Sequence, residues 1–342
     1  MEVVKLFSNC IPVRGYRRSI ICDLQLGRYK FIPNDLFDII QTYGYLDITF
    51  LREKYGQSNE AVINSYIDFL ISDSWGFYCD LDALDNFPPI ANDYVSPSRV
   101  ENAILDFSEQ TIPKINIANY DRAIRELSML GCVAVMLRFF AYDLTNEVIF
   151  KILNLFRASR IKEIVLVVKH SDKVDVDTIP DLFKEHLRVA QIIIHGAPHD
   201  KLLSFDQKGL SLIQAREPIN DATHCGFVSK RYFNIEIQSF FEAQHFNSCL
   251  NRKICIDHDG EMKNCPSFST SFGNIMTHNF ASIIENDKFR AAWEITKDMI
   301  DICKVCEFRY ICLDCRAFTT DSENLHAKPL HCQYDPLTAT WA

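Results

Sequence analysis

The pattern of apolar and polar positions at the start of the chain predicts a β-hairpin followed by three helices. The hairpin comes from the apolar-rich runs 18–24 and 29–32, which are separated by a turn through Gly27. The helices are marked by apolar residues three and four positions apart. The first begins at Asn34, the second covers 48–55 and the third covers 60–72. An aromatic stretch at 75–78 follows as a closing wing, so the pattern is typical of a winged helix.

Farther along the chain, residues 100–235 alternate strand-like and helix-like runs. The strands are expected at 103–105, 114–117, 133–137, 164–168 and 191–195, and the helices at 120–130, 147–156 and 179–187. This alternation predicts an α/β fold with a parallel sheet and right-handed crossovers. Continuously apolar runs such as 164–168 predict burial on both faces of that sheet. Prolines and turn-forming residues replace the periodicity over 83–99, which we interpret as a linker.

The C-terminal part of the chain is rich in cysteine. Eight of the 13 cysteines are Cys249, Cys255, Cys265, Cys303, Cys306, Cys312, Cys315 and Cys332. Eight thiolates are enough for two four-cysteine sites, and both zinc and iron–sulfur clusters take four thiolates. The first three are strung along the chain rather than paired as in a zinc ribbon, which favours clusters over zinc. An apolar strand at 254–256 runs into an Asp-Gly turn, which is expected to bring Cys265 back to Cys249 and Cys255.

This spacing resembles the SPASM domain, the auxiliary-cluster domain of peptide-modifying radical SAM proteins. The residues that carry the resemblance are Cys249-x10-Gly260-x4-Cys265, Cys303-x2-Cys306-x5-Cys312, Cys315 and Cys332, with two residues before Cys315 where the family usually has three. In that family, the cysteines that hold the two clusters are interleaved along the sequence. The resemblance therefore implies one [4Fe–4S] cluster held by Cys249, Cys255, Cys265 and Cys315, and a second held by Cys303, Cys306, Cys312 and Cys332. Zinc in both sites remains the alternative.

The predicted winged helix invites a DNA-binding interpretation, but its third helix is acidic. Glu60, Asp68 and Asp73 lie on or beside this helix, which has no Lys or Arg, and phosphates repel such a surface. Next to a SPASM domain, the segment resembles the PqqD-like element that captures the leader of a ribosomal precursor peptide. The leader would add as a strand to the exposed hairpin edge. Candidate contacts are the aromatic residues Tyr29, Phe31, Tyr66 and Phe69, although such residues also fill cores.

The alternating region resembles the partial barrel of radical SAM enzymes, with one departure. The CxxxCxxC loop that should follow the first barrel strand is absent, and no cysteine outside the C-terminal group is three or four residues from another. These cysteines are Cys10, Cys22, Cys79, Cys132 and Cys225. Binding of S-adenosylmethionine is therefore not expected. Cys22, Cys79 and Cys132 lie in apolar patterns and are expected to be buried thiols.

Composition and charge limit the classes of binding partner that we expect. The net charge of -9 disfavours nucleic acid and anionic membranes, whose binding requires clustered Lys and Arg. No apolar run reaches the roughly 18 residues of a membrane span, and residues 1–7 lack a signal-peptide core, so a reduced, cytoplasmic protein is expected. No glycine-rich phosphate loop occurs, so an ATP-dependent step would need a partner protein. The sequence 195–200 and His224-Cys225 are further candidates for chemistry at strand ends, with solvated loop histidines as the alternative.

Together, the three segments resemble the SPASM-containing maturases that act with an ATP-grasp ligase in grasp-with-SPASM peptide systems. The expected domains are a winged-helix peptide-recognition domain at 1–82, a linker at 83–99, a degenerate partial α/β barrel at 100–235 and a SPASM domain at 236–342. The resemblance implies maturation of a ribosomal precursor peptide and leaves open whether the protein is itself an enzyme. The alternatives are a non-enzymatic scaffold that presents the peptide to a ligase and a zinc-binding winged-helix regulator.

Overall fold

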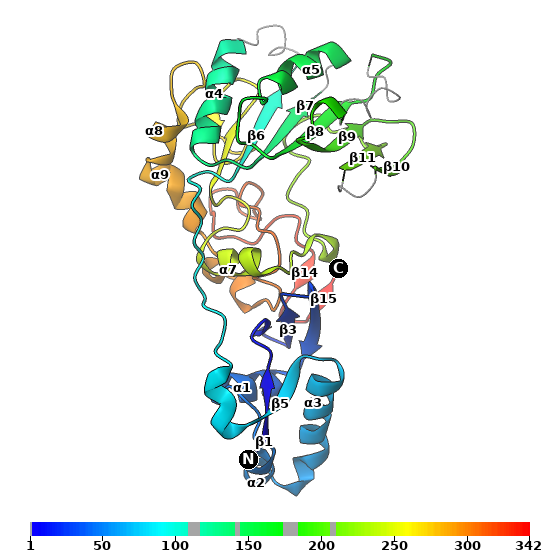
Figure 1. Cartoon of the computed structure of the whole chain (residues 1–342), viewed down its shortest axis with the longest axis vertical. Coiled ribbons are helices and arrows are strands. Elements are labelled where there is room, and N and C mark those ends of the chain that lie inside the picture. Colours follow the sequence, from blue (N-terminus) through cyan, green and yellow to red (C-terminus); the bar gives the residue numbers. More distant parts are fainter. Residues whose placement is uncertain (1, 109–116, 141–143, 174–183, 206–209) are drawn as a thin grey trace. The chain divides into compact units, whose positions relative to one another are not determined.

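The chain folds into two compact units, each built from separate stretches of sequence (Figure 1). The computed structural model describes residues 2–108, 117–140, 144–173, 184–205 and 210–342. The first unit contains Met1–Tyr94, Phe227–Ser248 and Ile295–Ala342, and the second contains Val95–Gly226 and Cys249–Glu294. The stretch 236–342, which the sequence predicts as one domain, is thus shared between the two units.

The N-terminal part of the first unit combines four strands, three α-helices and a returning strand. Its elements are β1 (Glu2–Leu6), β2 (Cys10–Val13), β3 (Ser19–Asp23), β4 (Arg28–Ile32), α1 (Asn34–Tyr43), α2 (Ile48–Tyr55), η1 (Gln57–Asn59), α3 (Glu60–Ser72), β5 (Gly76–Asp80) and η2 (Leu81–Asn86). The three strands β2, β3 and β4 form an antiparallel sheet in that order, while β1 pairs with β5. The predicted hairpin, three helices and closing strand are confirmed; the winged-helix assignment remains a prediction.

The three helices pack their apolar stripes around Trp75. Ile63, Ile67 and Leu70 are the buried residues of α3, and their four-and-three spacing places them on one face. Helix α2 begins after Asp47, whose carboxylate accepts a hydrogen bond from the Phe50 amide at 3.0 Å. Tertiary packing against a shared core is what stabilises such short helices.

The rest of the first unit consists of short elements from the cysteine-rich part of the chain. These are η4 (Lys230–Tyr232), α7 (Ile237–His245), η6 (Lys297–Met299), η7 (Cys303–Val305), β14 (Tyr334–Asp335) and β15 (Thr340–Trp341). Aromatic side chains form their core, with Phe308 at 5.1 Å from Tyr334 and 4.9 Å from Phe233 between ring centroids. Phe240 and Phe241 from α7 belong to the same core.

The second unit is organised around an eight-stranded, mostly parallel sheet. Its elements are β6 (Asn102–Phe107), α4 (Ile117–Met129), β7 (Ala134–Phe139), α5 (Asn146–Asn154), β8 (Glu163–Lys169), β9 (Val189–His195), β10 (Lys201–Phe205), β11 (Leu210–Ala215), β12 (Lys253–Ile256), β13 (Met262–Lys263), α8 (Phe280–Ile284), α9 (Asp287–Arg290) and η5 (Ala291–Glu294). The strand order is β10-β11-β9-β8-β7-β6-β12-β13, and only β10 and β13 pair antiparallel with their neighbours. The mixed α/β fold class is confirmed.

The adjacent ends of β6 and β7 carry a buried ion pair. Phe107 and Phe139 end β6 and β7 and stack at 4.7 Å between ring centroids. One residue earlier, Arg138 donates two hydrogen bonds to Asp106, at 2.6 and 2.7 Å, and both side chains are buried. The carboxyl ends of β6 and β7 are therefore held in fixed register by a bidentate ion pair.

Most elements that the sequence predicts for this region are confirmed, and two strands were missed. The expected strands at 103–105, 133–137, 164–168 and 191–195 correspond to β6, β7, β8 and β9, and the helices at 120–130 and 147–156 correspond to α4 and α5. The predicted strand 114–117 falls outside the described residues except for Ile117, which begins α4, and most of the predicted helix 179–187 also lies outside them. Strands β10 and β11 were not predicted.

None of the helices in the described ranges combines the length and apolar character that crossing a bilayer requires.

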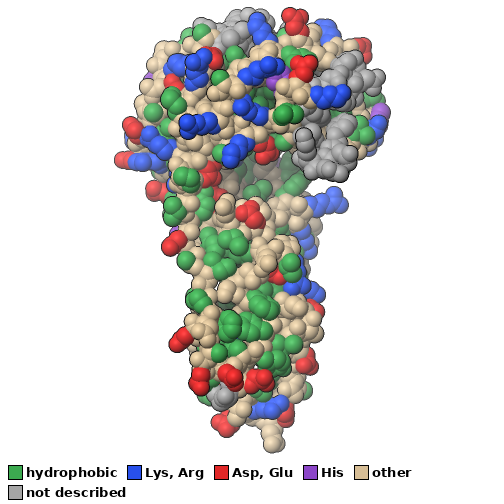
Figure 2. All heavy atoms as spheres, in the orientation of Figure 1, with side chains coloured by type: hydrophobic (Ala, Val, Ile, Leu, Met, Phe, Trp, Pro, Cys, Tyr) green, Lys and Arg blue, Asp and Glu red, His purple; other side chains and the backbone are tan. Residues whose placement is uncertain are grey.

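On the face shown in Figure 2, acidic side chains gather over the end of the first unit that carries α1, α2 and α3. Glu60, Asp68 and Asp73 on or beside α3 contribute to this acidic character.

Candidate metal centres

Four cysteines of the first unit surround one cavity. They are Cys303, Cys306, Cys312 and Cys332, and the walls also include Lys297, Phe308, Tyr334 and Trp341. The cavity is small, with a volume of about 20 Å³. The first two thiols come from η7 and the residue after it, where the Cys306 amide donates to the Cys303 carbonyl at 2.9 Å. The structure therefore brings together the four thiols that the sequence assigns to one cluster.

Burial controls the protonation of these thiols. It raises the pKa of Cys303 to about 11, and it also raises the pKa of Cys312, although the nearby Lys297 acts in the opposite direction on both. Without a metal these two thiols are therefore protonated near neutral pH. Metal ligation requires thiolates, so loading this cavity would release protons.

A second group of thiols belongs to the other unit and is built on the edge of the parallel sheet. Cys255 lies on β12, which pairs in parallel with β6 so that Cys255 faces Ile104. Strand β13 returns beside β12 with Lys263 opposite Cys255, and the Cys255 thiol contacts the Asn264 carbonyl oxygen at 3.3 Å. The chain therefore reaches Cys265 directly beside Cys255, as the sequence predicts for this turn.

Asp257 and Gly260 shape the turn between β12 and β13. The Asp257 carboxylate accepts hydrogen bonds from the amides of Asp259 and Glu261, both at 3.0 Å. Gly260 has a φ of +81°, and a Cβ atom there would lie 2.9 Å from Ile275. The glycine in the cysteine spacing is thus required both by the backbone conformation and by close packing.

Lys253 and Cys225 complete this second group. The ammonium of Lys253 lies 3.5 Å from the Cys249 sulfur. Burial raises the pKa of Cys225, and the charge of Cys249 raises it further. The hydroxyl of Ser267 donates to the Ala222 carbonyl at 2.9 Å and so joins the Cys265 loop to the Cys225 loop. Cys225 was not assigned to a metal site from the sequence, because it is distant from the other cysteines along the chain.

The predicted fourth ligand of this group, Cys315, belongs to the first unit and is buried between Asp314 and Arg316. The ligand set Cys249, Cys255, Cys265 and Cys315 therefore remains a prediction. Within the described residues, no group of three or more His, Cys, Asp or Glu side chains is arranged to hold a single metal ion.

The sequence predicts that Cys22, Cys79 and Cys132 are buried thiols. Cys22 and Cys132 are buried, as predicted, whereas Cys79 is only half-buried. Burial raises the pKa of Cys132 to about 12 and also raises the pKa of Cys22. Thiols with raised pKa values are weak nucleophiles, which fits a packing role.

Of the histidines at the strand ends, His195 has a structural role. It is buried at the end of β9, its Nδ1 accepts a hydrogen bond from the Ile219 amide at 3.0 Å, and its Nε2 lies 3.4 Å from the Phe139 carbonyl oxygen. Burial lowers the pKa of His195, so the neutral ring that both backbone contacts require is favoured. His224 is exposed, and its Nδ1 lies 3.8 Å from Oδ1 of Asp221.

The four aromatic residues proposed for peptide binding lie in two separate places. Tyr29 and Phe31 on β4 contact each other at 5.7 Å and both contact Phe308, while Tyr66 and Phe69 on α3 pack against the helical core. Phe69 stacks on Trp75 at 6.2 Å. Phe31 remains 39% exposed. Strand β4 pairs with β3 on one side, and its other edge has no strand partner among the described residues.

Comparison with known proteins identifies one domain. Residues 248–307 match the SPASM domain, an iron–sulfur cluster-binding domain. The SPASM match contains Cys249, Cys255, Cys265, Cys303 and Cys306, and it ends before the last three cysteines of the group. The SPASM match thus supports iron–sulfur binding by the cysteine-rich part of the chain.

The other comparisons are weaker. No curated protein matches the chain. Among solved structures, that of Streptococcus suis SuiB is similar over 95% of this chain and 98% of its own, with 9% sequence identity and a TM-score of 0.37. Similarity at this level carries no functional conclusion.

Proposed function

We propose that this protein takes part in the maturation of a ribosomally made peptide and carries two [4Fe–4S] clusters in residues 236–342. The observation that carries the proposal is the cavity lined by Cys303, Cys306, Cys312 and Cys332, which overlaps the SPASM match. Four thiols around one small cavity provide a complete ligand set for one cluster. Such a cluster would supply one-electron redox chemistry or structural support.

Metal analysis of anaerobically purified protein tests this proposal directly. About eight iron and eight sulfide per chain are expected for two [4Fe–4S] clusters, together with the broad visible absorption of iron–sulfur proteins. Zinc without iron would overturn the proposal and favour the zinc-binding regulator instead. A matched sample of the Cys132→Ala variant should retain the full iron content, because this thiol is buried in the core of the second unit and belongs to neither predicted ligand set.

We further propose that residues 1–82 bind the leader of the precursor peptide at the open edge of β4. An edge strand offers unpaired backbone donors and acceptors, and an extended peptide can pair with them. Phe31 lies on this strand, remains partly exposed and has the guanidinium of Arg18 at 3.5 Å from its ring centroid. A peptide strand here would add backbone hydrogen bonds and cover that ring.

Peptides selected from a random display library provide a probe for this edge. Hydrogen exchange with a selected peptide bound should show slowed exchange at the amides of β4, and Phe31→Ala should weaken binding. Phe50→Ala is the matched control, since Phe50 has the same exposure, 40% against 39%, but lies on α2. Equal loss of affinity in both variants, or protection confined to other elements, would contradict the proposed edge.

The proposed partner for ATP-dependent chemistry is a separate ATP-grasp ligase, because the chain has no glycine-rich phosphate loop. Two roles are possible for the protein beside such a ligase: an enzyme that modifies the peptide, or a scaffold that presents it. Incubation of precursor peptide and ligase with and without this protein separates the roles. A product that requires intact clusters supports the enzyme, whereas one formed equally well by cluster-free protein supports the scaffold.

A further inference from the structure

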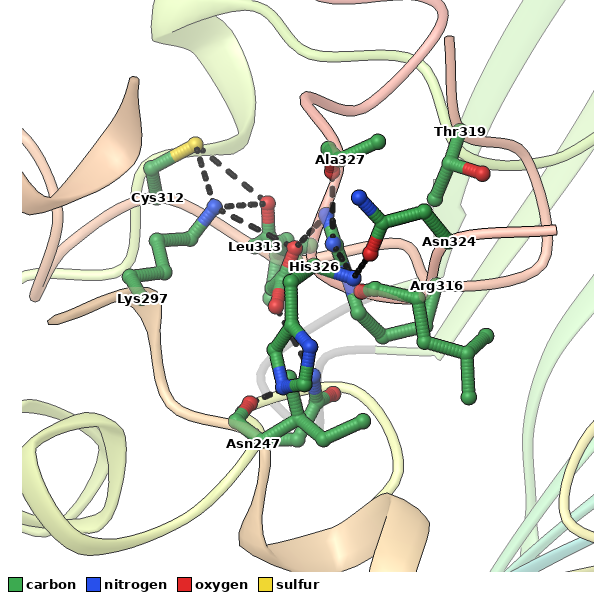
Figure 3. Close-up of polar contacts among 12 residues, drawn as sticks. Asn247, Lys297, Cys312, Leu313, Arg316, Thr319, Asn324, His326 and Ala327 are labelled. Atoms are coloured by element: carbon green, nitrogen blue, oxygen red, sulfur yellow. Dashed lines mark hydrogen bonds and ion pairs between the residues drawn. The ribbon is translucent and has the colours of Figure 1, made fainter. Parts of the chain in front are cut away.

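Lys297 is a buried lysine whose ammonium group lies against the thiol cavity of the first unit (Figure 3). Its side chain is 4% exposed. Nζ lies 3.2 Å from the Leu313 carbonyl oxygen, 3.6 Å from the Asp314 carboxylate and 3.7 Å from the Cys312 sulfur. A lysine is rarely buried to this extent without a strong anionic partner.

Lys297 shares the Asp314 carboxylate with a second cation. Asp314 Oδ1 lies 3.6 Å from Nζ of Lys297 and 2.7 Å from Nη2 of Arg316. Asp314 and Arg316 are each 1% exposed. Two cations therefore face one carboxylate, so this buried group of three side chains has a net positive charge.

The geometry of Arg316 and Asp314 fixes this pair independently of the lysine. Arg316 Nη1 donates to the carbonyl oxygens of Leu325 and Ala327 at 2.7 and 2.8 Å, and Asn247 donates to the second carboxylate oxygen of Asp314 at 2.8 Å (Figure 3). Asp314 is therefore shared between Arg316, Asn247 and Lys297. Among the sulfurs of the cavity, that of Cys312 lies within reach of the Lys297 ammonium.

We propose that Lys297 is the charge partner of the cluster in this cavity, with its ammonium donating a hydrogen bond to the Cys312 thiolate and raising the reduction potential. The inference rests on the proposed function, since it requires a cluster held by these four cysteines. Reduction by one electron from a chemical reductant adds one negative charge inside the cavity. A buried ammonium stabilises that added charge more than solvent-screened lysines do.

An EPR-monitored redox titration with dithionite as reductant tests the inference. Lys297→Met should shift the potential of one cluster to a more negative value and leave the other cluster unchanged as an internal control. Lys304→Met is the matched surface control, because Lys304 follows Cys303 directly but its side chain is 51% exposed and paired with Asp301. Lys297→Arg keeps the charge and should stay near the wild-type potential.

The outcomes separate the inference from the function on which it depends. Wild-type protein without iron would overturn the proposed function, whereas two loaded clusters with the same potentials in wild type and Lys297→Met would overturn only the role of Lys297. If Lys297→Met loses iron, pulsed EPR of reduced wild-type protein labelled with [¹⁵N]lysine decides. A ¹⁵N coupling that disappears in Lys297→Arg supports the contact with the cluster, and an unchanged coupling overturns it.

Discussion

Arg28 donates a hydrogen bond from Nε to the buried carboxylate of Asp23, at 3.1 Å, and so links the last residue of β3 to the first residue of β4 across the hairpin turn. The other carboxylate oxygen accepts hydrogen bonds from the backbone amides of Gln25 and Leu26, at 3.1 and 3.0 Å. The guanidinium of Arg28 also lies 4.4 Å from the ring centroid of Trp75. One carboxylate thus fixes the turn of the hairpin whose open edge we propose as the leader site.

Replacing Asp23 with Ala should therefore destabilise the first unit. The substitution leaves two turn amides and Nε of Arg28 without their acceptor, while Arg28 keeps its hydrogen bonds to the carbonyls of Asp73 and Ser74. A hydrogen bond to a charged group contributes about 1.5–3 kcal/mol. Urea unfolding measures the change. The exposed residue Asp93 provides the control, because Asp93→Ala is expected to stay within about 0.5 kcal/mol of wild type.

The contribution of Asp23 should also depend on pH. Burial works to raise the pKa of this carboxyl, but its hydrogen bonds with Leu26, Arg28, Gln25 and Asn9 outweigh burial and lower it. A lowered pKa in the folded state means that the stabilisation is complete above the unfolded value of about 3.9 and is lost as the pH falls through the folded value. The difference between wild type and Asp23→Ala should therefore shrink below about pH 4; a constant difference down to pH 2 would show that ionisation is not involved.

The elements predicted correctly from the sequence are those whose signal is local. The turn between β12 and β13 was predictable because an apolar strand runs into Asp259-Gly260, and α3 because its apolar spacing is complete within the helix itself. Parallel strands such as β8 were predictable because burial on both faces leaves a continuous apolar run.

What the sequence did not predict depends on contacts between distant parts of the chain. Strand β1 pairs with β5 at the far end of the N-terminal region, and its short stretch has no turn signal linking it to that partner. Cys225 reaches the Cys249 group only because strand β11 returns the chain to the sheet. Lys297 begins the short helix η6, and a lysine is normally expected at the surface. Its burial can be recognised only from the folded structure, in which Lys297 lines the thiol cavity.

The ion pair between Arg138 and Asp106 leads to a prediction for the second unit. Arg138→Met would leave Asp106 buried without its guanidinium, which is expected to cost about 3–5 kcal/mol. The double variant Arg138→Met with Asp106→Leu should recover most of that loss, since apolar residues of similar size can replace a buried pair. Thermal and urea unfolding of the single and double variants measure this recovery. A double variant as unstable as Arg138→Met would show that the pair has a further partner.

Replacing both Cys303 and Cys306 with Ala should remove one cluster and destabilise the cysteine-rich part of the first unit. Two of the four thiols that line the cavity are lost, and the binding energy of a cluster is part of the folding energy of its domain. Iron should fall to about half, and the melting temperature should fall with it. Cys132→Ala is the control, because it also removes a buried thiol but affects only packing. It should therefore leave the iron content unchanged. Unchanged iron and melting in the double variant would contradict the assignment.

The last prediction concerns reductive cleavage of S-adenosylmethionine, which we do not expect from this protein even with both clusters loaded and dithionite present. Cleavage requires an iron with a free coordination position. In the sequence, residues 108–116, which follow β6, contain no cysteine, so the three-thiolate loop of radical SAM enzymes cannot form there. Clusters held by four cysteines have no free position for the cofactor.

The measurement is the amount of 5'-deoxyadenosine formed from S-adenosylmethionine, compared with cluster-free protein. Equal amounts are expected. Formation above that background would mean that one cluster has an open iron, and the second unit provides the thiols to examine first, because three of the four predicted ligands of its cluster lie together there with Cys225 beside them. Cys225→Ala and Cys315→Ala would then separate the two possible fourth ligands: the variant that changes the yield identifies the thiol that controls access to that iron.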